Sequence, residues 1–410
     1  MKRLPRVLLL ACLACLCVGT MPSELPNGEI PPDLKPVVDG NTRFALELYA
    51  KLKESRENLF ISPYSVSSAL GIAYAGARGM TEQQMADVLH FPLDQNECHA
   101  AMAKIRKALV RSEKTRGIEL NVANGLWPQK GHAFSRDFLR IAQKKYDAGI
   151  EYVDYRTSAG RARDRINDWI EQNTAHRIKN ALSSGDVSPD TWLIIANAIY
   201  FKGEWASRFD KAQTKPAPFW ISAAESVETP MMQQESVLLF AEGETLQVLE
   251  LPYKEHELSM IVLLPKERAG LAALEAQLTP QNLSAWLRGL ERRTVNVQLP
   301  KLKIESNLPL RGSLMAMGMP DAFGMGLADF TGMAPEGAFF IFGVKHAAVV
   351  EVDEEGTVAA AATTVHGGCG RVDHPPAPAT FHADHPFIFL IRDNRTGTIL
   401  FLGRVLDPTQ

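Results

Sequence analysis

The 410-residue chain is poor in cysteine, and its five cysteines are unevenly placed. Cys12, Cys15 and Cys17 lie in an apolar N-terminal segment, which leaves only Cys98 and Cys369 for the body of the chain. Two cysteines cannot form the disulfide framework that holds small exported domains together, so stability must come from a large core. A single bridge between these two is compatible with the sequence, but two free thiols are expected.

The motifs of hydrolases and metal centres are also absent. There is no G-x-S-x-G elbow and no H-E-x-x-H, and the only C-x-x-C lies in the N-terminal apolar segment. The ten histidines are scattered, and His99, His132 and His366 lack the spacing of metal ligands. We therefore expect no enzyme activity, no metal and no cofactor.

Neither a strong net charge nor a long apolar run occurs in the body of the chain. The formal net charge of −3 gives no tendency toward nucleic acid or membrane surfaces. No stretch reaches the about 18 apolar residues of a membrane span. Hydrophobic residues make up 46% and charged residues 22%, which is a globular composition. We expect a monomer with no nucleic-acid partner and no membrane span.

The N-terminus differs from the rest. Three basic residues precede an apolar run over residues 7–18, and small Gly19 follows. This pattern predicts a secretory signal peptide over residues 1–19. We therefore expect a secreted, extracellular protein, or a periplasmic one in a bacterial host. Cleavage at Cys12 or Cys15 would instead give a lipid-anchored protein, although the residues before each fit that poorly.

The remaining chain is organised as an arm and one domain. Residues 20–38 are rich in proline and polar side chains, which predicts an N-terminal arm rather than a helix or strand. Residues 39–410 contain no internal repeat and no second linker, so we predict one large domain despite the length.

Helical patterns come first in this domain. Apolar residues recur at helical spacing over 41–52, 97–114 and 160–182. Ser62-Pro63 predicts a helix start, with Ser62 as N-cap and Pro63 in the first turn. A further helix is predicted to begin at Thr81, with Gln84 three residues later as its capping partner.

Strand patterns follow and dominate the later part. The segments that predict strands are 58–61, 117–127, 191–203, 246–253, 258–265, 294–305 and 347–354. Two strongly apolar segments, 386–393 and 398–405, surround the polar turn 394–397 and predict a hairpin. Because helices come first and strands later, without a βαβ rhythm, the predicted fold class is α+β.

Residues 354–365 form an unusual segment, EEGTVAAAATTV. An alanine run typically favours a helix, but β-branched residues on both sides favour the extended form. A short surface helix or a flexible loop is the simpler interpretation of the composition. In the extended form, the side chains are slim enough for the segment to enter a packed interior as a strand.

Five segments, in order, resemble signatures of the serpin family. They are NLFISPYSVSSALGIAYAGARGMT (58–81), NAIYFKGEW (197–205), LPKLKIES (299–306), EVDEEGTVAAAAT (351–363) and FHADHPFIFLIRDNRTGTILFLGRV (381–405). The resemblance covers about residues 41–408. It implies an α+β domain of three β-sheets and about nine helices, with an exposed reactive-centre loop between Glu354 and Phe381.

The resemblance also implies a function, inhibition of a serine-type endopeptidase by a suicide-substrate mechanism. The target protease attacks the loop and forms a covalent complex, and the cleaved loop inserts as a new strand into the central sheet of a metastable protein. The implied hinge consists of Glu354, Glu355, Gly356, Thr357, Val358, Ala359, Ala360, Ala361, Ala362 and Thr363. Alternation along a strand would turn Thr357 inward and Val358 outward. Inhibitory members usually carry a polar residue where Val358 stands, and an outward position makes this departure mild.

The scissile bond has three candidate positions. The usual family spacing, counted from Gly356, puts Gly370 before the bond and Arg371 after it. A shift of one residue would place the cut between Arg371 and Val372 and imply a trypsin-like target. The opposite shift would use Cys369. An inhibitor of papain-like cysteine proteases is an alternative.

Six further positions match residues that control strand separation in the family, and we assign them gating roles. They are Ser62, Ser65, Asn197, His346, Trp205 and Lys301. The first four match a hydrogen-bonding cluster beneath the point where the central strands part. The last two match the region where the loop enters, where Lys301 would face Glu354. Buried polar groups or surface ion pairs are the simpler interpretation.

A polyanion such as heparin is a further candidate partner. Lys104, Lys107, Arg111 and Lys114 recur at steps of three and four residues, which places them on one helical face. Some serpins bind glycosaminoglycans on the corresponding helix, but a solvated helix face explains the pattern more simply. A non-inhibitory serpin, such as a carrier or chaperone, is the other functional alternative. The hinge holds no large, charged or proline residue from residue 356 to 365, which favours inhibition.

Overall fold

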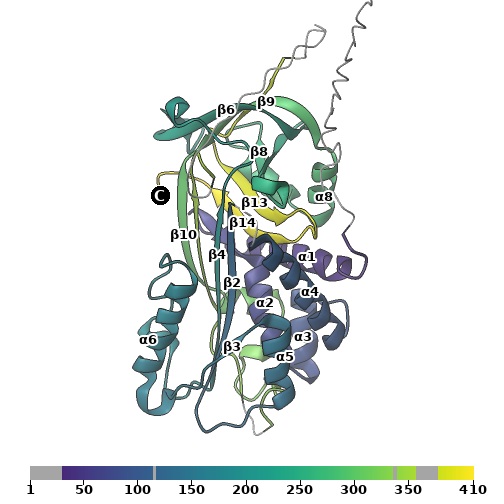
Figure 1. The fold of residues 1–410 in the computed structure, drawn as a ribbon, viewed down its shortest axis with the longest axis vertical. Helices are drawn as coiled ribbons and strands as arrows, with labels where there is room; N and C mark the ends of the chain where they lie inside the picture. The colour runs from purple at the N-terminus through teal and green to yellow at the C-terminus, as the bar shows by residue number, and fades with distance from the viewer. Residues whose placement is uncertain (1–29, 114–116, 336–338, 357–376) are drawn as a thin grey trace, which may run out of the picture.

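The computed structural model describes residues 30–113, 117–335, 339–356 and 377–410. Within these ranges the chain forms nine α-helices and three β-sheets (Figure 1), which confirms the predicted α+β class. The helices are α1 Lys35–Leu52, α2 Pro63–Tyr74, α3 Gly79–Leu89, α4 Gln95–Glu113, α5 Arg136–Tyr146, α6 Tyr155–Asn173, α7 Leu271–Gln277, α8 Pro280–Arg288 and α9 Arg311–Met317.

The largest sheet has nine strands in the order β1-β14-β13-β8-β7-β6-β9-β12, with β5 paired to β6. Its strands are β1 Leu59–Ile61, β5 Lys215–Trp220, β6 Ser226–Glu242, β7 Leu246–Pro252, β8 Leu258–Pro265, β9 Glu291–Pro300, β12 Ala379–His382, β13 Phe387–Asp393 and β14 Ile399–Val405. The apolar strands β8 and β14 are buried along their whole length. The hairpin predicted at the C-terminus is β13–β14, an antiparallel pair.

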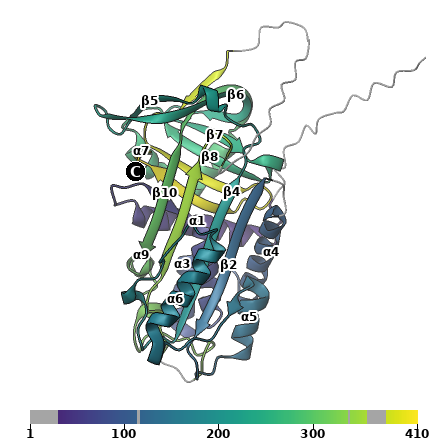
Figure 2. The same cartoon turned by 60° about the vertical axis from the view of Figure 1, so that its left-hand side comes forward.

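Two smaller sheets lie side by side. One has the order β3-β2-β4, with β2 Ile118–Pro128, β3 Gly149–Ile150 and β4 Leu193–Gly203. The other consists of β10 Leu302–Pro309 and β11 Lys345–Val352. In Figure 2 the yellow-green strand β11 lies between β10 and β4, and α6 lies in front of these strands. The other long helices, including α2, α4 and α5, lie on the opposite face (Figure 1).

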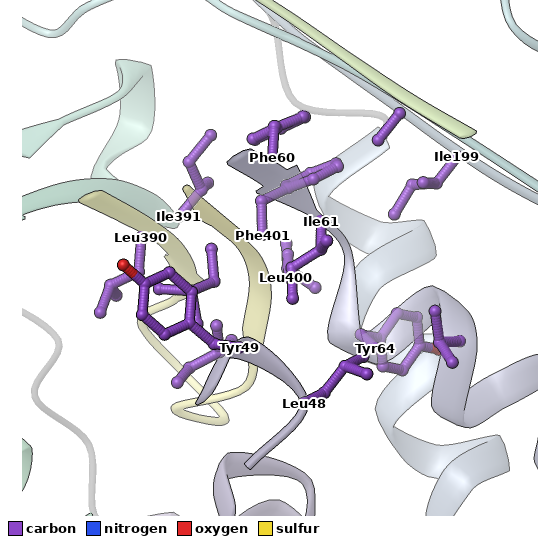
Figure 3. Close-up of a cluster of buried hydrophobic side chains, with 14 of the residues drawn as sticks. Leu48, Tyr49, Phe60, Ile61, Tyr64, Ile199, Leu390, Ile391, Leu400 and Phe401 are labelled. Carbon is purple, nitrogen blue, oxygen red and sulfur yellow. The ribbon is translucent and has the colours of Figure 1, made fainter. Parts of the chain in front are cut away.

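The hydrophobic core lies between the large sheet, the three-stranded sheet and the helices α1 and α2. Figure 3 shows side chains of α1, α2, β1, β4, β13 and β14 converging there. The ring of Phe60 stacks against Phe389 and Phe401, with centroids 5.9 and 5.1 Å apart. Burial of each such large apolar side chain contributes about 1.5–3 kcal/mol. Because the chain has few cysteines, its stability depends on this core.

Several element boundaries differ from the sequence predictions. The first helix begins at Lys35 rather than at residue 41, so residues 35–38, predicted as part of the arm, are helical. The third begins at Gly79, with Arg78 as N-cap. The predicted capping pair Thr81 and Gln84 instead accepts hydrogen bonds from the distant backbone N–H groups of residues 329 and 321.

Two long predicted elements are shorter than expected. The helix predicted over 160–182 ends at Asn173 because Ala175 and His176 adopt positive φ angles of 48° and 59°, which a helix cannot contain. The strand predicted over 294–305 is two strands, β9 and β10, which belong to different sheets. The sequence patterns missed α5, α7 to α9, β3, β5, β6 and β12.

The N-cap prediction at Ser62 is confirmed. Its side-chain oxygen accepts a hydrogen bond from the backbone N–H of Ser65 at 3.2 Å, and Pro63 occupies the first turn of α2. Among the residues that the structure describes, no helix has the length and apolar character of a membrane span. The predicted signal peptide lies outside the described residues.

Candidate functional site

The candidate site is the seam between β4 and β11, which we call the seam. β4 pairs with β2 along its whole length, and β11 pairs with β10 along its whole length. No ladder joins β4 to β11 in the described part of the chain, although the two strands are neighbours. A strand edge carries N–H and C=O groups that can pair with another strand. The seam therefore presents two facing edges to a strand that enters it.

Residues 353–356, which we call the hinge base, close the upper end of the seam. Gly356 forms an antiparallel bridge with Glu204, just beyond the end of β4. The backbone N–H groups of Trp205 and Phe209 donate to the carbonyl oxygens of the two hinge-base glutamates at 3.0 and 2.9 Å. The indole Nε1 of Trp205 donates to the carbonyl oxygen of Asp353 at 2.9 Å. These bonds hold the hinge base against the β4 side of the seam.

Gly356 is required by this geometry. Its φ angle is 140°, and a Cβ at this position would lie 2.0 Å from the carbonyl oxygen of Gly203. Only glycine adopts such a conformation without strain. A residue with a side chain could therefore not keep the bridge to Glu204 at this position.

Two acidic side chains fix the hinge base to its surroundings. The Glu354 carboxylate accepts hydrogen bonds from Lys301 Nζ at 3.0 Å and from Thr214 Oγ1 at 2.8 Å. Glu355 pairs with Lys211. Burial acts to raise the pKa of the Glu354 carboxyl, but hydrogen bonds from its own backbone N–H, Lys301 and Thr214 outweigh burial, so the pKa lies below its usual value. The charged carboxylate is thus the stable form in the folded protein.

A second cluster of polar residues lies lower in the seam, around the start of α2. The backbone N–H of Ser62 donates to Nε2 of His346, on β11, at 2.9 Å, and its hydroxyl donates to the carbonyl oxygen of Leu400 at 2.6 Å. Because Nε2 accepts, the imidazole is neutral with its proton on Nδ1. Burial lowers the pKa of His346 to about 4, which agrees with this form.

The chain of hydrogen bonds continues into the three-stranded sheet. The Ser65 hydroxyl donates to Oδ1 of Asn197, on β4. Nδ2 of Asn197 donates to Oδ1 of Asn124 at 2.8 Å, and Nδ2 of Asn124 donates to the carbonyl oxygen of Tyr146 at 2.8 Å. One buried polar network thus connects α2, β4, β2 and the end of α5. A shift of β4 against α2 must break it.

The lower seam encloses a cavity of about 280 Å³. Its walls come from α2, β4, β11 and the segment that follows α6, and they include Ser65, Asn197 and His346. The lining is mostly apolar, with Ala69, Ile195 and Ala347 among its members. The seam is therefore closed by hydrogen bonds at the top and incompletely filled below, which is a suitable arrangement for a strand of small side chains.

The family profile of "Serpin (serine protease inhibitor)" matches residues 39–408 of the sequence. The chain belongs to the serpin family. Members of this family are in general protease inhibitors rather than enzymes. Serpin B3 of Homo sapiens is 39% identical over 390 residues, which cover 90% of this chain and 99% of the relative.

Two other relatives agree with this assignment. Leukocyte elastase inhibitor of Sus scrofa is 40% identical over 378 residues, covering 90% of this chain and 98% of the relative. The crystal structure of uncleaved ovalbumin superposes with a TM-score of 0.81 at 29% identity and covers 91% of this chain and 100% of that one. The fold of this serpin is thus shared over nearly the whole domain.

The structure brings the six proposed gating residues of this serpin into two groups. Ser62, Ser65, Asn197 and His346 form the lower network, and Trp205 and Lys301 contact the hinge base. Their gating role stays a prediction. Residues 357–363 of the hinge and the reactive-centre candidates Cys369, Gly370, Arg371 and Val372 lie outside the described residues.

The polyanion candidates are only partly described. Lys104 and Lys107 are exposed on α4, and Lys104 pairs with Asp33. The side chain of Arg111 and all of Lys114 lie outside the described part, so binding of a polyanion stays a prediction. Cys98 is a buried free thiol on α4, and burial raises its pKa to about 11.

Sequence reasoning missed several residues of the site in this serpin. Thr214 and Lys211 bind the hinge-base glutamates, yet nothing in the sequence near residue 211 marks them. Asn124 could have been predicted as a partner of Asn197, because residues 117–127 and 191–203 were both predicted as strands and both contain asparagine. Asn124 lies directly opposite Asn197 in the β2–β4 register. The register itself cannot be read from either strand alone.

Proposed function

We propose that this serpin is a suicide inhibitor of a serine-type endopeptidase. After cleavage, the loop that follows Gly356 enters the seam and carries the acylated protease with it. The observation that carries this proposal lies directly below the hinge base, where the facing edges of β4 and β11 pair with no other strand among the described residues. The segment able to enter them is continuous in sequence with the hinge base itself.

The energetics favour entry of the cleaved loop. A strand that pairs on both edges makes on the order of ten new backbone hydrogen bonds, each contributing about 0.5–1.5 kcal/mol net. Alternate side chains along the loop, beginning with Thr357, are threonine, alanine, alanine, threonine and valine. Small or β-branched residues of this kind avoid overpacking of the interior. The intact loop cannot make these bonds while its other end is held in β12.

We further propose a trypsin-like target, with cleavage after Arg371, because a basic residue suits the acidic specificity pocket of such proteases. Cleavage after Gly370 or Cys369 would imply another target class, including papain-like cysteine proteases. Incubation with trypsin, chymotrypsin, elastase and papain tests the proposal. A complex that resists boiling in detergent is expected with trypsin, and mass spectrometry of the released C-terminal fragment locates the cut.

Thermal scanning separates an inhibitor from a carrier or a passive substrate. The cleaved protein is expected to melt tens of degrees above the intact one if the loop has entered the seam. Cleavage without a covalent complex and without this change in melting temperature would show a non-inhibitory serpin.

We also propose that residues 1–19 direct export and are then removed. The basic residues before the apolar run and small Gly19 after it support this. N-terminal sequencing of the mature protein from a secreting host tests it, and retention of Met1 would contradict it.

A further inference from the structure

The loop returns to the large sheet through β12, and the residues that follow β12, 383–386, contact three further strands. We call these residues the returning turn. The carbonyl oxygen of Gln298, on β9, accepts a hydrogen bond from the backbone of the turn at 2.9 Å, and the backbone N–H of Trp220, on β5, donates to the turn at 2.7 Å. The contact with β8 is made by a side chain, that of His385, which is only 5% exposed.

Both ring nitrogens of His385 face oxygen atoms that accept hydrogen bonds. Nε2 lies 2.7 Å from the carbonyl oxygen of Pro265, the last residue of β8, and Nδ1 lies 2.7 Å from a carboxylate oxygen of Asp384. Burial acts to raise the pKa of the Asp384 carboxyl, but the hydrogen bond from His385 and the charges of His385 and Arg268 outweigh burial, so the pKa lies below its usual value and the carboxylate stays an acceptor. A neutral imidazole has one N–H and could donate to only one of these oxygens, whereas an imidazolium donates to both. The geometry therefore requires the imidazolium.

Few other charged groups surround this pair. Arg268, in the connection after β8, acts on Asp384 through its charge, and its guanidinium stacks on Trp220 at 3.9 Å from the ring centroid. Burial lowers the pKa of His382, at the end of β12, although the charge of Asp384 acts to raise it. Strand β8 contains no ionisable side chain, and those of β5, β9 and β13 lie at the ends remote from the turn, namely Lys215, Glu291, Arg292, Arg293, Arg392 and Asp393. The ionisable side chains of the neighbouring connections are exposed to solvent, namely Glu225, Lys266 and Glu267.

Loss of the second proton from His385 must disturb the returning turn. A neutral imidazole leaves two acceptors facing each other at 2.7 Å, either at the carboxylate or at the carbonyl oxygen. In a nearly buried site this contact is costly, so the two acceptors separate. The turn leads directly out of β12, which has four residues and pairs only with β9 in the described part of the chain. A loosened turn therefore weakens the attachment of this short strand.

We propose that His385 is a proton-dependent anchor for the returning end of the loop, and that loss of its second proton allows β12 to leave β9 while the loop is still intact. This inference rests on the proposed function, because an intact loop whose returning end is free can enter the seam without cleavage. A molecule in that state no longer traps a protease. His385 is a positioning residue and contributes to neither cleavage nor recognition of the protease.

The variants for the test separate the charge of His385 from its size. His385→Lys keeps a cation that can donate to both acceptors, so the turn should not respond to pH between 6 and 9. Asp384→Asn presents an amide donor to Nδ1, so a neutral imidazole keeps both bonds and the response to pH should again disappear. His385→Gln removes the charge and should leave the turn loose throughout this range. His382→Gln is the matched control, because the pKa of His382 lies below its usual value.

Two measurements on the intact protein need no protease. NMR of the imidazole nitrogens, assigned by the signals missing in His385→Gln, should show both nitrogens of His385 protonated at pH 7. Hydrogen exchange of residues 379–386, corrected for the intrinsic rate at each pH, should become about tenfold faster or more from pH 6 to pH 9 in the wild type and in His382→Gln. This is the change expected when a hydrogen bond between charged groups is lost. The corrected rate should stay constant in His385→Lys and in Asp384→Asn.

Storage of the uncleaved protein tests the consequence for trapping. Samples kept at pH 6 and at pH 9 are returned to pH 7 and assayed for covalent complex with trypsin, for melting temperature and for intact mass. The wild type should lose complex formation faster at pH 9, with its mass unchanged and its melting temperature raised. His385→Lys should lose complex formation at the same rate at both pH values.

The outcomes separate the anchor from the proposed function. A single protonated nitrogen on His385 at pH 7 overturns the anchor, and so does a corrected exchange rate that is independent of pH in the wild type. An equal response to pH in His385→Lys, or faster exchange without faster loss of complex formation, also overturns it. If the NMR and exchange results are as expected but the fresh wild type forms no covalent complex with any protease, the anchor stands and the proposed function fails.

Discussion

Lys301 and Glu354 meet at 3.0 Å, and their side chains are 39% and 5% exposed, respectively. The lysine lies between β9 and β10, while the glutamate belongs to the hinge base. A nearly buried carboxylate is thus paired with a cation that still reaches water. Removing the cation leaves a charge that the folded protein cannot hydrate, whereas removing the carboxylate leaves a lysine that water can solvate.

We therefore predict that Lys301→Met lowers the free energy of unfolding by about 2–4 kcal/mol, because it leaves an uncompensated buried charge. The matched control is Lys303→Met, two residues along the chain, whose pair with Glu305 is more than half exposed on both sides. The control should change stability by less than about 1 kcal/mol. Denaturant unfolding measures both, and equal effects would contradict the role assigned to burial.

The second prediction concerns Gly356. Substitution by alanine places a methyl group against the carbonyl oxygen of Gly203 and forces an unfavourable φ angle. The hinge base should separate from Glu204, at a cost of about 1–3 kcal/mol. Gly343→Ala is the control, since a Cβ there meets nothing within 4 Å. A fall in the melting temperature of the intact protein is expected for Gly356→Ala alone.

The third prediction is a pH dependence of stability. The pKa of His346 is lowered by burial from 6.5 to about 4, and the pKa of His99 is likewise lowered, by burial, to about 4. Between these pH values the unfolded chain binds protons that the folded protein does not. The free energy of unfolding should therefore fall as the pH falls from 6.5 to 4, by up to about 1.4 kcal/mol per unit for each histidine.

The histidine variants identify the source of this slope. Between pH 6.5 and 4, His346→Gln should remove the part of the pH dependence of the free energy of unfolding that one imidazole contributes. His99→Gln should remove a part of similar size. The interval from pH 7 to 8, where neither imidazole titrates, serves as the internal control. A slope that persists in both variants would assign the effect to other groups. Below about pH 4.3 a further loss is expected as Glu354, whose pKa is lowered in the folded protein, becomes protonated.

The fourth prediction uses the two faces of the loop. Thr357→Arg would place a charge inside the seam after cleavage, at a cost of several kcal/mol. This variant should be cleaved by the target protease but form no detergent-resistant complex. Val358→Arg is the control, because alternation turns residue 358 outward. Equal trapping by both variants would mean that the loop does not enter as a regular strand.

Local patterns of the sequence predicted the parts of the site that depend on neighbouring residues. The Ser62 cap is readable because a serine followed by proline begins a helix by itself. The position of Glu354 opposite Lys301 followed from the family resemblance, and the structure places the two in contact. Lys211 and Thr214 were missed because they reach the hinge base from a connection that becomes adjacent only after folding.

The predicted elements failed where tertiary structure overrides local preference. Residues 294–305 alternate like one strand, but the chain changes sheet at Pro300 and Lys301. Pro300 was a local signal of this change, because proline has no N–H to donate to a strand ladder, and the prediction overlooked it. Residues 174–182 contain enough apolar residues to look helical, yet positive φ angles at Ala175 and His176 end α6 at Asn173. Their apolar side chains Ile178 and Ala181 are instead buried against α6 and β4, a contact that the sequence alone does not reveal.

The change of sheet between β9 and β10 links the two ends of the loop. The loop departs from β11, which pairs with β10, and returns through β12, which pairs in parallel with β9. Because β9 and β10 are joined through one short stretch of backbone, both ends of the loop pair with the same continuous segment of the chain. A pull on the departing end is therefore transmitted to the returning end without crossing the core. If the loop is cut, the departing end stays paired with β10 and the returning end stays paired with β9, so hydrogen bonds to this one stretch of backbone still hold the two fragments together.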